Sequence, residues 1–256
     1  MFKSKQLKQD WNKDLPKYWY DESPLKTHFF NAMSITFPKG ETMFVDIVKV
    51  YSQHITDPRI KENCVEFVKQ EYWHTFAHKQ FNRWISNQGL PVNSIEEHLD
   101  KKIQLIRKSP KVVWLGFTAG IEHVTTVLAT HVLTYPGFIE KMHPHFKELW
   151  VWHSKEEVEH QAVTLEIWNE LNIPRKNLRL IMTIAAIITV YCMLYYTYLL
   201  LKHDKQLWKW RTVKDAMSLF FSPKDGLIKS LWHWFRCWKP NFLPNPVEYQ
   251  HLTANK

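Results

Sequence analysis

The stretches QEYWHTFAH (residues 70–78) and WHSKEEVEHQAV (residues 152–163) decide the fold of this chain. In each of them a glutamate precedes a histidine by three residues. The four residues are Glu71, His74, Glu157 and His160. Residues three or four apart lie on one side of a helix, so the two members of each pair face the same way. Apolar residues extend that side in both directions, which predicts two helices whose core-facing stripes are ionisable at their centres.

The two stripes can be followed over several helical turns. The first contains Cys64, Phe67, Glu71, His74, His78, Phe81 and Ile85, and the second contains Phe146, Trp150 or Leu149, His153, Glu157, His160, Thr164, Ile167 and Leu171. Two further predicted helices each carry one inward glutamate. Glu122 lies among the small and apolar residues of one, and Glu41 begins the apolar face of the other.

Proline, glycine and asparagine mark the ends of the four predicted helices. The helices run from Pro38-Lys39-Gly40 to about Gln53, from Asp57-Pro58 to near Asn87, from Ser109-Pro110 to before Pro136-Gly137, and from Pro144 to near Asn172. A shorter amphipathic helix is expected around residues 94–107. The pattern predicts an all-α fold, a ferritin-like four-helix bundle with one long crossover. A long apolar helix and C-terminal amphipathic helices follow.

The inward ionisable groups form a recognisable ligand set. In chain order they are one Glu, one Glu-x-x-His, one Glu and a second Glu-x-x-His, as in bundles that hold two iron or manganese ions. Four buried carboxylates are costly without cations, and two divalent ions neutralise them. Carboxylate oxygen with imidazole nitrogen favours iron, with manganese and zinc as alternatives. The predicted ligands are Glu41, Glu71, His74, Glu122, Glu157 and His160.

Other histidines lie close to these residues in the sequence. His78 and His153 fall on the same stripes, and are expected either as further ligands or as side chains that orient the ligands. His123 is next to Glu122, and because neighbours on a helix point about 100° apart, it is expected to point away. The alternative for the whole set is that the charges are solvated and the helices pack by other faces. That arrangement would expose Phe67, Phe81, Ile167 and Leu171.

Composition narrows the class of protein. The 256 residues include 34 Lys+Arg and 25 Asp+Glu, a formal charge of +9, and 13 Trp. A disordered chain is excluded by 45% hydrophobic residues, and six Gly argue against Gly-rich phosphate-binding folds. The positive charge and the aromatic content favour lipid headgroups over nucleic acid as a partner. The separated Cys64, Cys192 and Cys237 indicate neither a disulfide framework nor a thiolate metal site.

The C-terminal third suggests contact with a membrane. Residues 180–201 include no charged side chain and are long enough to cross a bilayer, although a fully buried helix is the alternative. Residues 227–238 carry a Trp-rich apolar face with basic edges, which fits a membrane interface or packing on the bundle. The expected division is a metal-binding bundle at 1–175, an apolar helix at 176–204 and an amphipathic tail at 205–256. We expect the protein on the cytoplasmic side of the inner membrane, membrane-associated or crossing it once.

Four stretches together resemble a known family. They are HFFNAMSITFPKGE (28–41), QEYWHTFAH (70–78), GIEHVT (120–125) and WHSKEEVEHQAV (152–163). Over residues 19–168 the chain resembles the bacterial, ferritin-like family of predicted metal-dependent hydrolases. The resemblance implies a dinuclear metal site carried by the six predicted ligands, with His78 and His153 as additional histidines of the motifs.

Three functions remain open from the sequence. The first is a di-iron enzyme that uses dioxygen and an electron donor to oxidise, hydroxylate or desaturate an apolar or acyl substrate. The second is a dinuclear hydrolase in which Glu156 or His153 acts as the catalytic base. The third is a membrane-associated metal-binding protein without catalytic activity. The sequence does not predict the oligomeric state.

Overall fold

The computed structural model describes residues 4–239 and 242–243, and their regular secondary structure is helical. Within those residues the strand-like pairing is limited to a single antiparallel bridge between Tyr20 and Met142. The predicted all-α class is therefore confirmed, whereas the specific likeness to ferritin stays a prediction.

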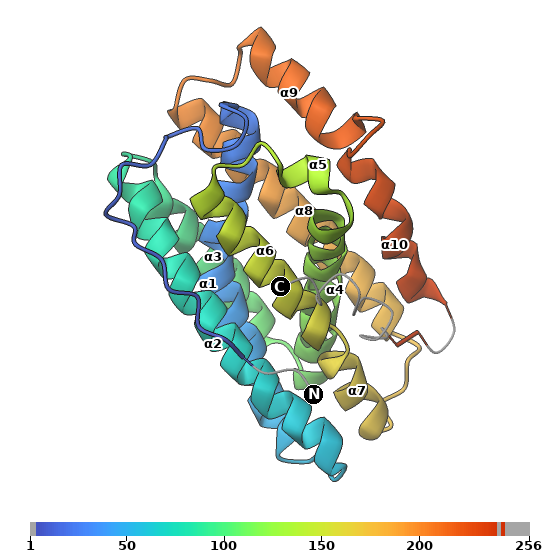
Figure 1. Ribbon diagram of the computed structural model, residues 1–256. Coiled ribbons are helices and arrows are strands. Elements are labelled where there is room, and N and C mark those ends of the chain that lie inside the picture. The colour runs from blue at the N-terminus through green and yellow to red at the C-terminus, as the bar shows by residue number, and fades with distance from the viewer. Residues whose placement is uncertain (1–3, 240–241, 244–256) are drawn as a thin grey trace.

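Four helical rods form the bundle (Figure 1). They are α1 (Pro24–Ser52), α2 (Pro58–Asn87), α4 (Lys111–Thr134) and the consecutive pair α6 (Pro144–His160) and α7 (Val163–Glu170). Helix α1 packs along α2, and α4 packs along α6. The crossover between α2 and α4 contains α3 (Val92–Lys108), and the short α5 (Pro136–Ile139) precedes α6. The crossover helix expected around residues 94–107 is thus confirmed.

The predicted start of the first helix at Pro38 is wrong. Helix α1 begins at Pro24, its first turn is capped by Ser23 Oγ, and Pro38 lies inside the helix. An internal proline costs about 3 kcal/mol. The turns before Pro38 bury Phe29 and Phe30, and this apolar burial outweighs the cost.

The fourth predicted helix is interrupted. It begins at Pro144 as expected, but α6 ends at His160 and the chain resumes as α7 at Val163. At the interruption the side-chain amide of Gln161 donates a hydrogen bond to the carbonyl of Val158, 2.8 Å away. This hydrogen bond gives the Val158 carbonyl a side-chain partner where the helix is interrupted.

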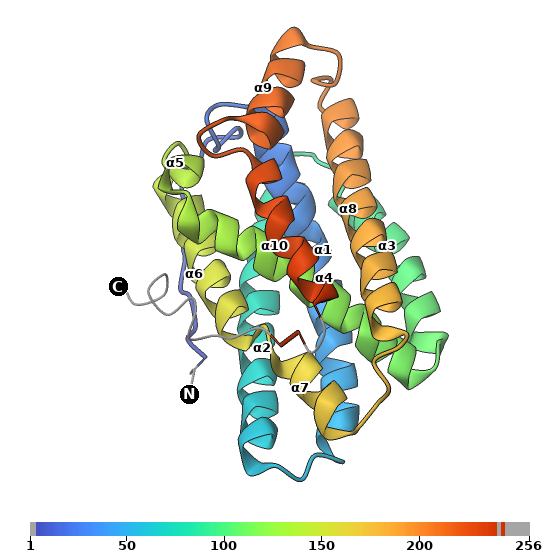
Figure 2. The same ribbon diagram turned by 90° about the vertical axis from the view of Figure 1, so that its right-hand side faces the viewer.

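The apolar helix α8 (Leu178–His203) runs along the bundle, on the side also occupied by α9 and α10 (Figure 2). It packs against α4 and α1. Gly120 permits the contact with α4, because a Cβ added there would lie 2.8 Å from Ala185 Cβ and from backbone atoms of Met182. The opposite side of α8 is exposed and apolar, with Leu180, Ile184, Ile187, Val190, Tyr191 and Leu194.

The tail returns to the bundle. It contains α9 (Trp210–Phe221), then three consecutive helical turns, η1 (Leu227–Ser230), α10 (Leu231–Phe235) and η2 (Arg236–Trp238). Ser230 Oγ lies 2.6 Å from His131 Nδ1, and the carbonyl of Trp234 accepts a hydrogen bond from His123 Nε2 at 3.1 Å. The segment therefore packs on α4, as one of the two expectations held, while Trp232 and Phe235 are exposed and the membrane interface stays a prediction. The proposed division into three regions stays a prediction.

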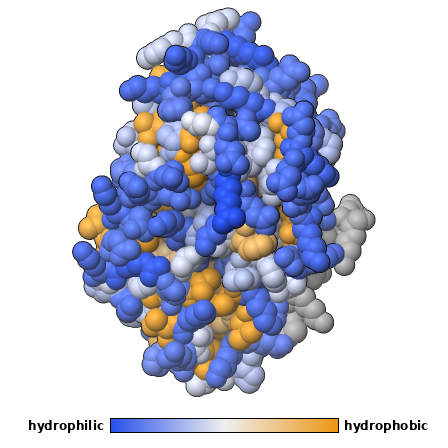
Figure 3. Space-filling view, turned by 90° about the vertical axis from the view of Figure 1, so that its left-hand side faces the viewer, coloured by the Kyte–Doolittle hydropathy of each residue, from blue (hydrophilic) through white to orange (hydrophobic). Residues whose placement is uncertain are grey.

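The core consists of two apolar clusters along the bundle. One contains Phe30, Phe81, Phe146 and Trp150, and the other contains Met43, Phe67, Leu115 and Ile167. Along α2, and along α6 and α7, the ionisable residues of the stripe lie between residues of one cluster and residues of the other. Outside the core, the left-hand face of Figure 1 is largely hydrophilic, with separate apolar patches (Figure 3).

Candidate metal centre

The structure brings together every metal ligand predicted from the sequence. Helix α1 supplies one of these residues, α2 three, α4 one and α6 three. They are Glu41, Glu71, His74, His78, Glu122, His153, Glu157 and His160, and none is more than 3% exposed. Ionisable side chains that are almost never buried without partners are thus gathered in the middle of the bundle. The alternative of solvated charges is excluded by their burial.

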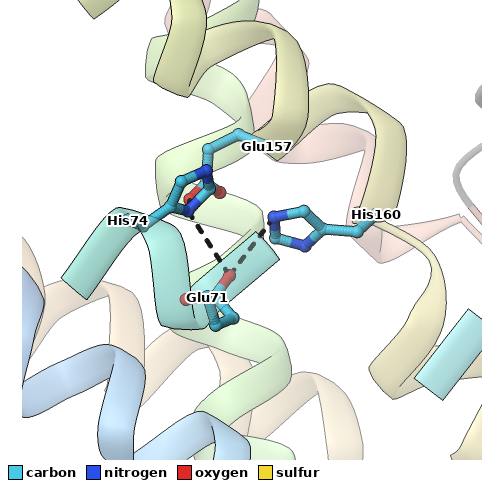
Figure 4. Close-up of side chains that lie close together, drawn as sticks. All are labelled: Glu71, His74, Glu157 and His160. Carbon is cyan, nitrogen blue, oxygen red and sulfur yellow. Dashed lines mark ion pairs between the residues drawn. The ribbon is translucent and has the colours of Figure 1, made fainter. Parts of the chain in front are cut away.

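A first group converges from α2 and α6 (Figure 4). One ligand atom from each of Glu71, His74, Glu157 and His160 lies within 4.8 Å of the others. His160 Nε2 is 3.2 Å from Glu71 Oε1, and His74 Nδ1 is 3.8 Å from the same oxygen. The other ring nitrogen of His160 lies 3.3 Å from Glu122 Oε2, which brings α4 to the same place.

A second group lies next to the first. Ligand atoms of Glu41, His78 and His153 fall within 4.8 Å of one another. His153 Nε2 lies 3.0 Å from Glu157 Oε1, so the imidazole of His153 joins the two groups. Each of these two adjacent clusters of nitrogen and oxygen donors could hold a metal ion.

The hydrogen bonding of the buried oxygen and nitrogen atoms indicates whether metal ions fit the centre. Among the described residues, both carboxylate oxygens of Glu71 and Glu122 and both ring nitrogens of His74 and His160 have no hydrogen-bond partner. A buried polar atom without a partner costs about 1–3 kcal/mol. Carboxylate and imidazole donors in these numbers suit hard or borderline divalent cations, so the residues fit the predicted ions.

Burial and neighbouring charges change the pKa values of the side chains at the centre. Burial, followed by the negative charges of Glu122, Glu41 and Glu157, raises the pKa of Glu71 well above its ordinary value. Burial also lowers the pKa of His74 well below its ordinary value. Positive charge at the centre would stabilise the ionised carboxylates and favour neutral imidazoles as ligands.

A hydrogen-bonded chain fixes the orientation of two histidines. Asn82 Nδ2 donates to the backbone carbonyl of Ser34 at 3.1 Å, so its Oδ1 accepts from Ser34 Oγ at 2.7 Å. The Ser34 hydroxyl has then used its hydrogen and accepts from His78 Nδ1, 2.9 Å away. His78 Nε2 must therefore accept from His153 Nδ1, at 3.0 Å. Nε2 of His153 is left facing Glu157.

Other side chains hold the carboxylates. Thr75 Oγ1 donates to Glu41 Oε2 and Thr125 Oγ1 donates to Glu157 Oε2, each at 2.8 Å. Neither threonine carries a sequence signal beyond standing next to other site residues. Asn82 could have been found, because it follows His78 by one helical turn, whereas Ser34 lies ahead of the predicted start of its helix.

Glu156, predicted as a possible catalytic base, occupies a particular position. Its Oε2 lies 3.2 Å from His74 Nε2, and its Oε1 accepts hydrogen bonds from the backbone N–H of Lys5 and from Trp152 Nε1. Burial raises its pKa to about 8. The carboxyl group thus contacts the ring nitrogen of His74 that points away from Glu71. His123 points away from the centre, as expected, and binds the tail.

An apolar cavity reaches the centre from the side of α3 and α8. Its volume is about 90 Å³, and Glu41 and Glu157 form part of its wall. The remaining wall is mostly apolar, from α1, α3, α4 and α8, and includes Phe37, Phe44, Ile106, Leu128, Ile188 and Met193. The metal centre is therefore accessible to an apolar molecule.

Comparison with known proteins agrees with this site. A family model described as "predicted metal-dependent hydrolase" matches residues 3–248, nearly the whole chain. No curated protein and no solved structure matches it. The matched region contains all eight residues of the two groups. The chain therefore belongs to the family of predicted metal-dependent hydrolases.

Proposed function

We propose that this protein is a hydrolase with two divalent metal ions at the centre described above. The observation that carries the proposal is the set of buried carboxylate and imidazole atoms without hydrogen-bond partners. Glu71, His74, Glu122 and His160 would hold one ion, and Glu41 and His153 the other, with Glu157 between them. Iron, manganese and zinc all suit these donors.

When bound, the two ions supply Lewis acidity that activates water and polarises an ester or phosphate group. The protein's own residues would orient the ligand side chains and exchange protons with the site. The chain from Asn82 to His78 keeps a proton on His153 Nδ1 and presents Nε2 to the centre, so His78 orients a ligand. Glu156 Oε2 lies 3.2 Å from the far ring nitrogen of His74 and would orient that ring by electrostatic attraction.

The choice between the two predicted bases follows from position. A general base must reach the proton that it abstracts. His153 contacts Glu157 at the centre, whereas Glu156 contacts the outer nitrogen of His74. His153 is proposed above as a metal ligand, which leaves Glu156 as the base. Glu156 would accept and release a proton through His74, and its pKa of about 8 suits that exchange at neutral pH.

Metal content and turnover test the proposal. Protein purified from native expression should contain about two metal ions per chain. Glu157→Gln should lose most of this metal, and Glu159→Gln, on the same helix but partly exposed, should retain it. Hydrolysis of model esters or phosphoesters under anaerobic conditions should require the metal. Metal-free wild-type protein, or equal metal in both variants, would contradict the assignment.

Oxidation with dioxygen is the second candidate. It is favoured by the apolar wall of the cavity beside Glu41 and Glu157. A substrate bound against this wall would present C–H bonds rather than polar groups to the centre. This function needs iron and an electron donor. Consumption of dioxygen by the reduced iron-loaded protein in the presence of long-chain substrates, with no anaerobic hydrolysis, would select it over the hydrolase.

A membrane location is proposed from the surface of α8. By length and composition, α4 and α8 are both apolar enough to cross a membrane, but α4 is largely buried in the bundle. On α8 the exposed side includes Ile187 and Tyr191, at 64% and 56% exposure. Basic residues flank the helix, and they would attract anionic lipid.

The packing of the tail favours association over crossing. Helix α9 contacts α1, and the segment after it contacts α4, so the chain before and after α8 meets on one side. A helix that crossed the bilayer alone would separate these segments. We therefore propose that α8 rests on the membrane at the cytoplasmic surface.

Vesicle flotation tests the membrane location. The protein should float with vesicles that contain anionic phosphatidylglycerol, and less with neutral phosphatidylcholine vesicles. The double variant Ile187→Glu, Tyr191→Glu should remain in the soluble fraction. Tyr72→Glu, at a 60% exposed site on α2, serves as the matched control and should float like the wild type. Equal flotation of the two variants would refute this role of α8.

A further inference from the structure

We propose that the cavity between α1, α3, α4 and α8 binds the hydrocarbon chain of a long-chain acyl ester. The ester group would lie at Glu41 and Glu157, and the chain would extend toward the exposed side of α8. The inference rests on the proposed function and names its substrate class. It is carried by the polarity of the cavity wall and by its opening at the surface of α8.

Charge is confined to the two ends of the cavity wall. Glu41 and Glu157 are 2% and 3% exposed and belong to the metal centre. The one other charged residue of the wall is Lys102 on α3, which is partly exposed and whose Nζ lies 5.9 Å from the ring centre of Tyr191. A molecule that fills the space between these ends meets no charge along its length.

The hydroxyl groups of the wall are already satisfied. Thr36 Oγ1 donates to the carbonyl of Met33 at 2.7 Å, and Thr189 Oγ1 donates to the carbonyl of Ala185 at 2.8 Å. The hydroxyl of Thr125 is bound to Glu157. A ligand therefore finds few free polar groups between the ends, which selects a hydrocarbon chain over a sugar, a nucleotide or a peptide.

Gly40 contributes free space at the inner end of the cavity. A Cβ added at this residue would have one neighbour within 4 Å, Phe44 Cζ at 3.9 Å. Glycine inside a helix costs about 1 kcal/mol relative to alanine. Since neither a turn nor a close backbone contact requires glycine here, its effect is to leave room one residue before Glu41.

The outer end of the cavity opens on an apolar surface. Ile188 belongs to the wall and is 40% exposed, and its neighbour Ile187 lies on the outer side of α8 and is not part of the wall. A chain that leaves the cavity at Ile188 therefore reaches the surface proposed to face lipid. An acyl chain can enter from there without passing through water, which an apolar chain avoids.

Binding of cis-parinaric acid, whose fluorescence rises in apolar surroundings, tests the cavity in the full-length, metal-loaded protein. Wild type should bind saturably, and palmitate should displace the probe while butyrate should not. Ile188→Trp, which narrows the mouth, should weaken binding at least tenfold. Ile187→Trp should bind like the wild type. Absence of saturable binding, or equal binding by the two tryptophan variants, would overturn the proposal.

The inner end is tested with a second pair of variants. Gly40→Leu should reduce binding of the probe at least tenfold, and Gly40→Ala should leave it within about twofold, because an added Cβ has room. Metal content measured on the same samples shows whether the centre remains intact. If Gly40→Leu does not fold, the Ile188 and Ile187 pair still decides the question.

Turnover separates this inference from the proposed function. With p-nitrophenyl esters of increasing chain length, kcat/KM of the wild type should rise with length, and the rise should be lost in Ile188→Trp. Hydrolysis of short and long esters at equal kcat/KM would overturn the acyl site and leave the hydrolase standing. Probe binding that depends on Ile188 without hydrolysis of any ester would support the chain-binding cavity and refute the hydrolase.

Discussion

At the scale of single residues, the centre depends on side chains that contact the predicted ligands. The hydroxyl of Ser34 links Asn82 to His78, and through His78 it sets the proton on His153. None of these links is visible as a motif. They nevertheless determine which nitrogen of His153 faces Glu157, and therefore whether that imidazole can act as a ligand.

Ser34→Ala should weaken metal binding by about 10–100-fold, because His153 loses the support that fixes its orientation. The change leaves the buried His78 Nδ1 and Asn82 Oδ1 without this partner and should lower the free energy of unfolding by about 1–3 kcal/mol. Competition with a chromophoric chelator measures the affinity. Thr42→Ala removes the hydroxyl that bonds the Pro38 carbonyl elsewhere on α1 and should leave the affinity unchanged. Equal affinities in the two variants would contradict the proposed chain.

Asp204 offers a second residue-scale prediction. Its carboxylate accepts hydrogen bonds from Tyr18 and His28 and pairs with Lys17, just after the last residue of α8. Burial alone would raise the pKa of Asp204, but these three partners outweigh it and hold the pKa well below its ordinary value. The ionised form therefore stabilises the fold, and this stability is lost as the pH falls through the lowered pKa.

Asp204→Asn should lower the free energy of unfolding at neutral pH by about 3 kcal/mol, because it leaves Lys17 and His28 without their buried partner. The difference from wild type should shrink below about pH 4, where the wild-type carboxylate begins to be protonated in the unfolded chain. Urea unfolding at several pH values measures it. A difference that is constant from pH 3 to pH 7 would contradict the assignment.

At the scale of elements, the contact between α4 and α8 depends on a glycine. Gly120→Ala places a Cβ 2.8 Å from Ala185 Cβ and from Met182 backbone atoms, so the two helices must separate. Overpacking of this kind costs about 1–3 kcal/mol. Gly40→Ala, where the Cβ has room, should instead stabilise the protein by up to about 1 kcal/mol. Urea unfolding of the two variants should give opposite signs.

The elements also show how far the sequence could predict the structure. Glu71 and His74, like Glu157 and His160, were predictable because helical periodicity is local and places them on an apolar stripe. The start of α1 was not, because Pro38 is a strong local signal for a helix end, and the burial of Phe29 and Phe30 that overrides it comes from distant segments. The cavity beside Gly40 likewise forms only when four helices meet.

At the scale of the whole molecule, the bundle surrounds a centre in which burial disfavours the ionised forms of Glu41 and Glu71. Glu41 and Glu71 have pKa values raised well above the ordinary carboxyl value, first by burial. A raised carboxyl pKa means stability that is present at low pH and lost as the pH rises through the folded-state pKa. His74 acts in the opposite direction, with stability lost on acidification below its ordinary pKa of 6.5.

Removal of metal should therefore lower Tm, and more so at higher pH. A ligand at about a hundred times its Kd stabilises by about 2.7 kcal/mol, which for a chain of this size is about 5–10 °C in Tm. Burial lowers the pKa of His160, but Glu122 and Glu157 outweigh burial and raise it above its ordinary value, so its stabilising protonation is also lost as the pH rises. The loss of Tm between about pH 6.5 and 8.5 therefore reports Glu41 and Glu71 together with His160. Calorimetry with and without a chelator measures this. Parallel pH profiles of the two forms would count against cations at these carboxyls.

The near-complete burial of the eight site residues has a consequence for how the protein acquires its ions. The cavity beside Glu41 and Glu157 has a mostly apolar wall that disfavours a hydrated cation, so we expect ion exchange to await local opening of the helices. The rates of metal binding and release would then be limited by the rate at which the helices open locally. The identity of the bound ion would then depend more on the ions available when the chain folded than on the ions in the buffer used later.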